Sequence, residues 1–89
     1  MPRISAFYGI VIWMYHDESH HSGRPHFHAR YGDDEASIDL HELSTIAGGL
    51  PTRALRLVIE WASAHQLELR KNWERARRHE PLLPVEPLP

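Results

Sequence analysis

The chain has 89 residues, of which 42% are hydrophobic and 25% charged, with a formal net charge of -2 and no cysteine. A chain of this length can build one core only, and its composition is typical of a soluble globular domain rather than of a disordered or membrane protein. The lack of cysteine excludes disulfides and thiolate zinc sites, and the small negative charge argues against nucleic-acid attraction over the whole surface.

The N-terminal residues, MPRISAFYG, contain no apolar run of the kind found in a signal peptide. The longest apolar run, residues 10–15, is far shorter than the ~20 residues that a membrane-spanning helix needs. Together with the absence of cysteine, these features predict a cytoplasmic protein with no membrane partner.

The first half of the chain predicts β-structure. Residues 7–16 are rich in β-branched and aromatic side chains, which indicates one central strand covered on both faces. Residues 17–25 have the composition of a loop. The stretches HFHARY (26–31) and EASIDL (35–40) alternate between apolar and polar residues, which predicts two half-buried strands. Residues 43–46 could add a short edge strand before Gly48-Gly49 turns the chain.

The alternation also limits how the two half-buried strands pair, because a slip of one residue would set one apolar face against a polar one. We expect Asp33 and Asp34 to form a two-residue loop. The core pairs are then Ala29 with Ile38 and Phe27 with Leu40, and the polar pairs are His28 with Asp39, His26 with His41 and Arg30 with Ser37.

The second half of the chain predicts two helices. Pro51 and apolar residues at helical spacing indicate an amphipathic helix over residues 51–65, and residues 67–78 carry a second apolar stripe opposite a basic one. Trp61 and Trp73 lie on these stripes, so we expect both in the core. Four prolines in residues 79–89 exclude helix and favour extended backbone, either free or laid on a surface.

These elements predict an α+β fold, in which a small antiparallel sheet of three to four strands carries two C-terminal helices on its apolar face. Residues 1–80 form the single domain in this prediction, and residues 81–89 form a proline-rich C-terminal tail.

The sequence resembles the domain of unknown function 4160 family. The resemblance rests on FYGIVIWMY near the start, PHFHARYG (25–32), EASIDL (35–40) and GLPTRALRLVIEWASAHQLELRKNWE (49–74), and it spans the chain from about Arg3 to Arg77. It implies a short bacterial protein, often encoded beside another small protein in the manner of a two-gene toxin-antitoxin module. This implication is genomic analogy rather than chemistry.

Four histidines lie within residues 20–30, and three interpretations of the polar sheet face remain open. Alternation alone can produce such a face, which is then simply solvated. A divalent transition metal such as zinc could instead be held by His20, His26, His28 and His41, since imidazole is a common ligand of such metals. In the third interpretation His26 and His28 exchange protons during RNA cleavage, Arg30 holds the phosphate and Asp39 orients a histidine.

The basic run of the second predicted helix has a comparable set of interpretations. It can contact phosphates, form a solvated face, or meet the acidic surface of a protein partner. The candidate residues for partner or nucleic-acid binding are Arg70, Lys71, Arg75, Arg77 and Arg78.

The resemblance, the small core and the basic helix together predict an interaction protein of a toxin-antitoxin-like module, whose partner is a small protein encoded by a neighbouring gene. RNA as a partner and association with a second copy of the chain remain open. The competing hypothesis is a histidine-dependent ribonuclease or a metal-binding enzyme that uses the polar sheet face. No nucleophile elbow, phosphate loop or dinucleotide fingerprint supports a more common class of enzyme.

Overall fold

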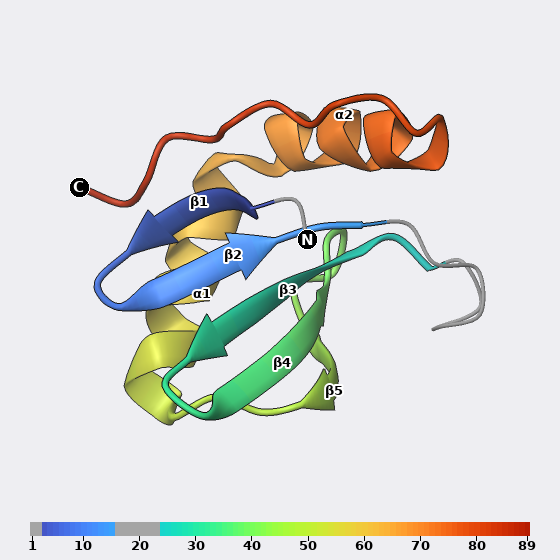
Figure 1. Ribbon diagram of the computed structural model, residues 1–89. Helices are drawn as coiled ribbons and strands as arrows, with labels where there is room; N and C mark the ends of the chain where they lie inside the picture. Colours follow the sequence, from blue (N-terminus) through green and yellow to red (C-terminus); the bar gives the residue numbers. More distant parts are fainter. Residues whose placement is uncertain (1–2, 16–23) are drawn as a thin grey trace.

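The computed structural model describes residues 3–15 and 24–89, which form a five-stranded antiparallel sheet and two helices. The strands lie in the order of the chain (Figure 1), and the α+β class is confirmed with five strands rather than three to four. The elements are β1 (Arg3–Phe7), β2 (Ile10–Trp13), β3 (His26–Tyr31), β4 (Asp34–Asp39), β5 (Thr45–Gly48), α1 (Thr52–Ala64) and α2 (Gln66–Arg77).

The predicted single strand over residues 7–16 is wrong, because the chain turns at Tyr8-Gly9 and forms the β1–β2 hairpin. Phe7 pairs with Ile10 across this two-residue loop. Both loop residues have positive φ, 49° for Tyr8 and 79° for Gly9, as in a type I′ turn. Tyrosine is rare at the first of these positions, so the turn carries little sequence signal.

The predicted β3–β4 register is also wrong, by two residues. The loop is Gly32-Asp33 instead of Asp33-Asp34, because Gly32 takes a φ of 61° as the first residue of a type II′ turn does. A shift of two residues preserves which face each side chain is on. It changes the partners, which are His26 with Asp39, His28 with Ser37 and Arg30 with Glu35.

The fifth strand spans Thr45–Gly48, slightly later than the short edge strand expected over residues 43–46. Gly48 has a φ of 70° and approaches β4 so closely that a Cβ atom there would lie 2.2 Å from the carbonyl oxygen of Glu35. A glycine is therefore required where β5 ends and the chain leaves for α1.

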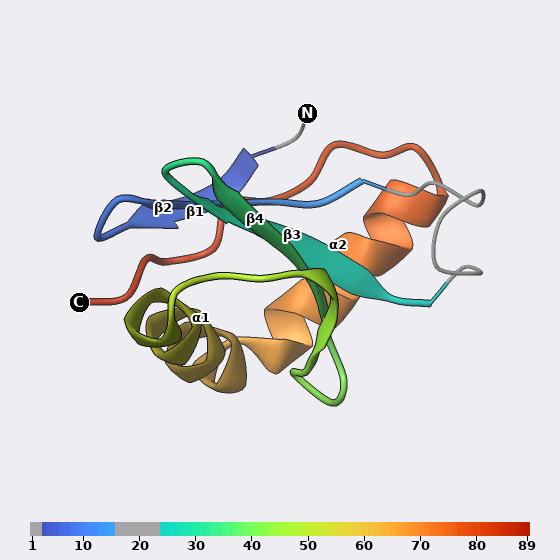
Figure 2. The ribbon, with the colours of Figure 1, turned by 90° about the horizontal axis from the view of Figure 1, so that it is seen from below.

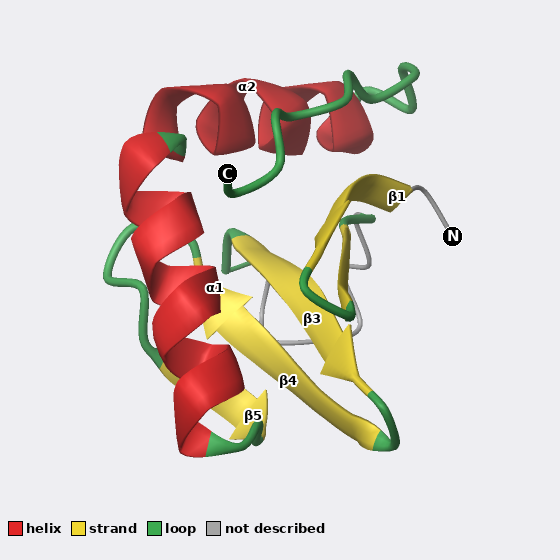
Figure 3. Ribbon diagram, turned by 90° about the vertical axis from the view of Figure 1, so that its left-hand side faces the viewer, coloured by secondary structure: helices red, strands yellow, loops and turns green. Residues whose placement is uncertain are grey.

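The two helices occupy different places around the sheet. Helix α1 lies across the apolar face (Figure 3), where the ring of Trp61 contacts the rings of Phe7 and Phe27 at centroid distances of 5.4 and 5.9 Å. Helix α2 changes direction at His65 and runs past one end of the sheet, with Leu69 in the core and Trp73 against His26. Trp61 and Trp73 are both buried, as expected. No helix in the described residues has the length and hydropathy of a membrane span.

The C-terminal segment after α2 runs back beside β1 (Figures 1 and 2), and it is extended as its prolines predict. The amide of Val85 donates to the carbonyl of Ile4 on β1, and the indole nitrogen of Trp61 donates to the carbonyl of Glu86. Val85 is only 4% exposed and belongs to the core. The tail thus covers the outer edge of β1, which would otherwise present unpaired backbone groups.

Candidate functional site

The polar face of β3 is enclosed by protein at its N-terminal end. His26 is 1% exposed and His28 is 5% exposed, and their cross-strand partners Asp39 and Ser37 are also buried. This differs from the solvated face that alternation alone would produce. Of the predicted catalytic residues, only Arg30 lies on the surface.

Aromatic rings surround both histidines. The imidazole of His28 stacks on Trp13 and Tyr15 at centroid distances of 5.3 and 4.9 Å, with interplanar angles of 11° and 2°. The ring of His26 meets His28 edge-on at 5.0 Å and lies 5.3 Å from Trp73 of α2. A continuous row of four rings, Trp13, His28, His26 and Trp73, therefore connects β2 to α2 through the polar face of the sheet.

The hydrogen bonds of the two histidines are consistent with a packing role. His26 donates from Nδ1 to the carbonyl oxygen of Arg24 at 2.7 Å, which fixes the proton on that nitrogen because a carbonyl can only accept. Nδ1 of His28 lies 3.3 Å from the hydroxyl of Ser37. The ring orientations are thus set by backbone and neighbouring strands, as in a well-packed interior.

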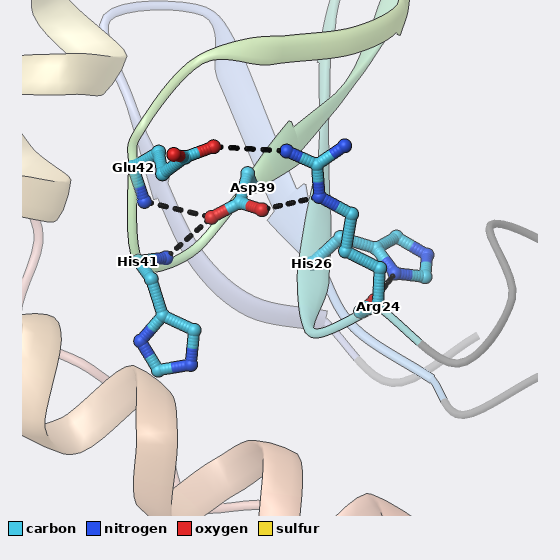
Figure 4. A network of polar contacts seen from close by, with 5 residues as sticks. All are labelled: Arg24, His26, Asp39, His41 and Glu42. Atoms are coloured by element: carbon cyan, nitrogen blue, oxygen red, sulfur yellow. Dashed lines mark hydrogen bonds and ion pairs between the residues drawn. The ribbon is translucent and has the colours of Figure 1, made fainter.

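Asp39 is the centre of a polar network at the end of β4 (Figure 4). One carboxylate oxygen accepts from the backbone amides of His41 and Glu42, both at 2.7 Å, and the other accepts from Nε of Arg24. The same guanidinium reaches Glu42 at 3.0 Å. Burial by itself raises the pKa of Asp39, but the bonds from Glu42, Arg24 and His41 outweigh it and lower the pKa below 3.8. Asp39 therefore remains ionised and orders the β4–β5 connection.

In one of the three interpretations of the polar sheet face Asp39 orients a histidine, whereas the network gives that carboxylate a different set of partners. One of its oxygens accepts from Arg24 and the other accepts from two backbone amides, although His26 stands opposite Asp39 in the register. Arg24 and Glu42 were not identified from the sequence as partners of Asp39. The composition of a loop does not show which acidic residue, distant in the sequence, its basic side chain will contact. The ion pair depends on the tertiary fold.

The predicted metal set is only partly covered by the described residues, since His20 lies outside them. Of its other members, the rings of His26 and His28 lie side by side at a centroid distance of 5.0 Å, whereas the ring of His41 is exposed and points away from Asp39 (Figure 4). Among the described residues, no group of three or more histidine, aspartate or glutamate side chains is arranged to hold a metal ion. Because His20 belongs to the predicted set, the interpretation as a zinc site stays a prediction.

A cleft of about 560 Å³ lies between α2 and the end of the sheet where β3 begins and β4 ends. We call it the α2 cleft. Arg70 and Arg77 of α2 line the cleft together with His41. The two arginines are seven residues apart, which is about two helical turns, and the buried Trp73 lies between them on the helix. Its lining residues are Pro25, Leu40, His41, Arg70, Trp73, Glu74 and Arg77.

The structure divides the five predicted basic residues. Arg70 and Arg77 line the α2 cleft, and Arg77 also pairs with Glu74 at 2.7 Å. Arg75 donates to the carbonyl of Pro81 and Arg78 lies 3.7 Å from Glu80, so both contact the start of the tail. Lys71 is exposed and lies outside the cleft lining. The run is thus partly structural and partly available for binding.

The sequence was compared with family models, curated proteins and solved structures. The model of the domain of unknown function DUF4160 matches residues 9–74, about three quarters of the chain. The chain belongs to the DUF4160 family. No curated protein and no solved structure matches it.

The DUF4160 match begins in the β1–β2 turn and ends within α2. It therefore includes the row of rings, the Asp39 network and all of the α2 cleft except Arg77. Strand β1 and the tail that covers its edge lie outside the matched residues. In this chain the matched DUF4160 residues and the flanking ones share a single core.

Proposed function

We propose that this DUF4160 protein is the interaction component of a bacterial, cytoplasmic two-gene module of the toxin-antitoxin type. In this proposal it binds the small protein encoded beside it, and the α2 cleft is the binding surface. The observation that carries the proposal is the placement of Arg70 and Arg77 on the two sides of Trp73 in one cleft.

The composition of the cleft supports protein binding. Protein interfaces are enriched in arginine and aromatic residues, and their strongest contacts combine a desolvated pocket with a charged rim. Leu40 and Trp73 supply an apolar floor, and Arg70 lines the cleft without an ion-pair partner among the described residues. An acidic side chain of the partner flanked by an apolar one would complement this arrangement.

The pairing of Arg77 with Glu74 adds specificity to the surface. The pair is half exposed, with side-chain exposures of 52% and 49%, so it contributes little to stability by itself. It does fix the orientation of the arginine next to the cleft. Mixed charges of this kind suit a protein surface better than a polyphosphate, because a nearby carboxylate repels phosphate oxygens.

The ribonuclease alternative requires the imidazoles of His26 and His28 to reach a scissile phosphate. General acid–base catalysis needs the base within hydrogen-bond reach of the substrate proton. Both rings are at least 95% buried and lie against aromatic side chains. For this reason we favour partner binding, with the histidines holding Trp73 and Trp13 in place.

Co-expression with the neighbouring gene tests the proposal. The wild-type chain is expected to co-purify with the neighbour's product and to change its effect on growth. Arg70→Glu should weaken the complex by about 30-fold or more, or ~2 kcal/mol, because losing one partner of a buried charge pair costs 2–5 kcal/mol. Binding is measured by isothermal titration calorimetry with the purified proteins.

Arg56→Glu is the matched control. Arg56 is exposed on α1, so this substitution makes the same reversal of charge at a position away from the α2 cleft. It should leave the dissociation constant within about twofold. The absence of any complex and of any growth effect would contradict the function itself. Equal losses from Arg56→Glu and Arg70→Glu would contradict the assignment of the surface.

A further inference from the structure

A second pocket, of about 340 Å³, lies on the polar face of the sheet away from α2. We call it the sheet-face pocket. Two arginines from different strands line it together with two apolar side chains of β2 and two turn glycines. Its lining residues are Arg3, Gly9, Val11, Trp13, Arg30 and Gly32.

The register explains why the two arginines meet there. Arg3 of β1 pairs with Trp13 of β2, and Val11 of β2 pairs with Arg30 of β3. Residues directly opposite one another share a face, and so do residues two apart on one strand, so all four side chains point to the same side. Strands β1 and β3 are separated by about 10 Å, two strand spacings, and the arginine side chains can both reach over β2.

The floor of the pocket is apolar and rigid. Val11 and Trp13 lie on β2, the strand between those that carry the two arginines, and Trp13 is held by its stacking on His28. The glycines at the two turns bring only backbone to the rim, and a Cβ at Gly32 would meet no atom within 4 Å.

Its electrostatics differ from those of the α2 cleft. None of the lining residues is acidic, and neither arginine forms an ion pair with another described residue. Arg30 donates from Nε to the carbonyl of Gly32 at 3.2 Å, which leaves its terminal nitrogens for a ligand. Glu35 stands opposite Arg30 in the register but does not line the pocket.

We propose that the sheet-face pocket binds a small phosphate monoester that carries a flat aromatic ring, of the class of a nucleoside 5′-monophosphate. A ligand carboxylate can be bound fully by the guanidinium group of one arginine. A phosphate dianion has enough oxygens and charge to bind the guanidinium groups of two arginines at once. The apolar floor takes the organic part of the ligand. The volume lies at the lower end of small-ligand sites, which fits one nucleotide rather than a polymer.

The experiment is a titration of the isotope-labelled full chain with adenosine 5′-monophosphate, followed by NMR. The side-chain Nε1–H signal of Trp13 reports from the pocket itself. We expect this signal to shift in a saturable way with the monophosphate. Inorganic phosphate should bind at least fivefold more weakly because it makes no contact with the floor, and adenosine at least tenfold more weakly because it lacks the charge.

Arg3→Gln and Arg30→Gln should each weaken monophosphate binding at least fivefold, and Arg30→Lys should retain part of it because it keeps the charge. Both arginines are exposed, so the variants are expected to fold. Arg56→Gln and Arg77→Gln are the controls, and each should leave the affinity within twofold.

Three results would overturn the proposal. The first is an unchanged affinity in both Arg3→Gln and Arg30→Gln. The second is equal affinity for the monophosphate and for adenosine or inorganic phosphate. The third is a loss in Arg77→Gln as large as that in Arg30→Gln, which would place the ligand in the α2 cleft.

Discussion

Replacing Gly48 by alanine tests how the β4–β5 pairing is built. The new Cβ would lie 2.2 Å from the carbonyl oxygen of Glu35, whereas real contacts of this kind do not fall below 3.0 Å, so the backbones must separate by about 1 Å. That movement strains the hydrogen bond from the amide of Gly49 to the same oxygen, which is 3.0 Å long. The φ of 70° is also unfavourable for any residue with a Cβ.

The expected cost follows from these two effects. A left-handed backbone costs roughly 1–2 kcal/mol for an L-residue. Loss of one backbone hydrogen bond adds about 1 kcal/mol. The total of about 2–3 kcal/mol corresponds to a fall in the melting temperature of roughly 10–20 °C for a domain of this size. Thermal and urea unfolding, each followed by circular dichroism, measure it.

Gly49→Ala is the matched control, because a Cβ at Gly49 meets no atom within 4 Å and its φ is not positive. It should change the unfolding free energy by less than about 1 kcal/mol, with stabilisation as the expected direction. If the two variants were equally stable, the close approach of β5 to β4 and the reasoning built on it would be refuted.

Two further predictions concern the polar network and the tail. Because the pKa of Asp39 is lowered on folding, its stabilising contribution is present above the unfolded value of about 3.8 and is lost as the pH falls through the folded value. Asp39→Asn should therefore cost clearly more stability at pH 6 than at pH 3, where the wild-type chain has itself lost part of this contribution. Urea titrations that gave the same difference between variant and wild type at both pH values would contradict this. Val85→Ala should cost about 1.5 kcal/mol because its two buried methyl groups are lost. Leu83→Ala, at a position 51% exposed, should stay within about 0.5 kcal/mol in the same unfolding assay, and equal effects would argue against a packed tail.

The elements that local pattern controls were predictable. Strand β3 has the predicted bounds, β4 begins one residue before its predicted start, and both helices lie within one residue of theirs. In each of these elements the spacing of the apolar residues places them all on the face that packs against the core, and this spacing can be read from the sequence. The faces of β3 and β4 were also correct, because a shift of two residues cannot exchange them.

The β1–β2 hairpin was missed because its turn carries little local sequence signal. Residues 7–16 read as a single apolar strand because β2 is buried and Tyr8 is an unusual first residue for a type I′ turn. Pairing with β1 on one side and β3 on the other stabilises the turn despite the positive φ of Tyr8. That stabilisation comes from non-local contacts, which no window of sequence contains.

By itself, the sequence determined the α+β class, the faces of the strands and the buried positions of Trp61 and Trp73, since hydrophobic periodicity decides all of these. Only the tertiary structure decided that His26 and His28 are enclosed by Trp13, Tyr15 and Trp73, since these rings come from the end of β2, the residues just after it and the distant helix α2. The tertiary structure also decided that Arg70 and Arg77 are the residues of the basic run that line the α2 cleft, and it placed Arg3 on the same face of the sheet as Arg30. Alternation determines the side of the sheet to which a residue points, but what covers that side depends on how the other elements pack.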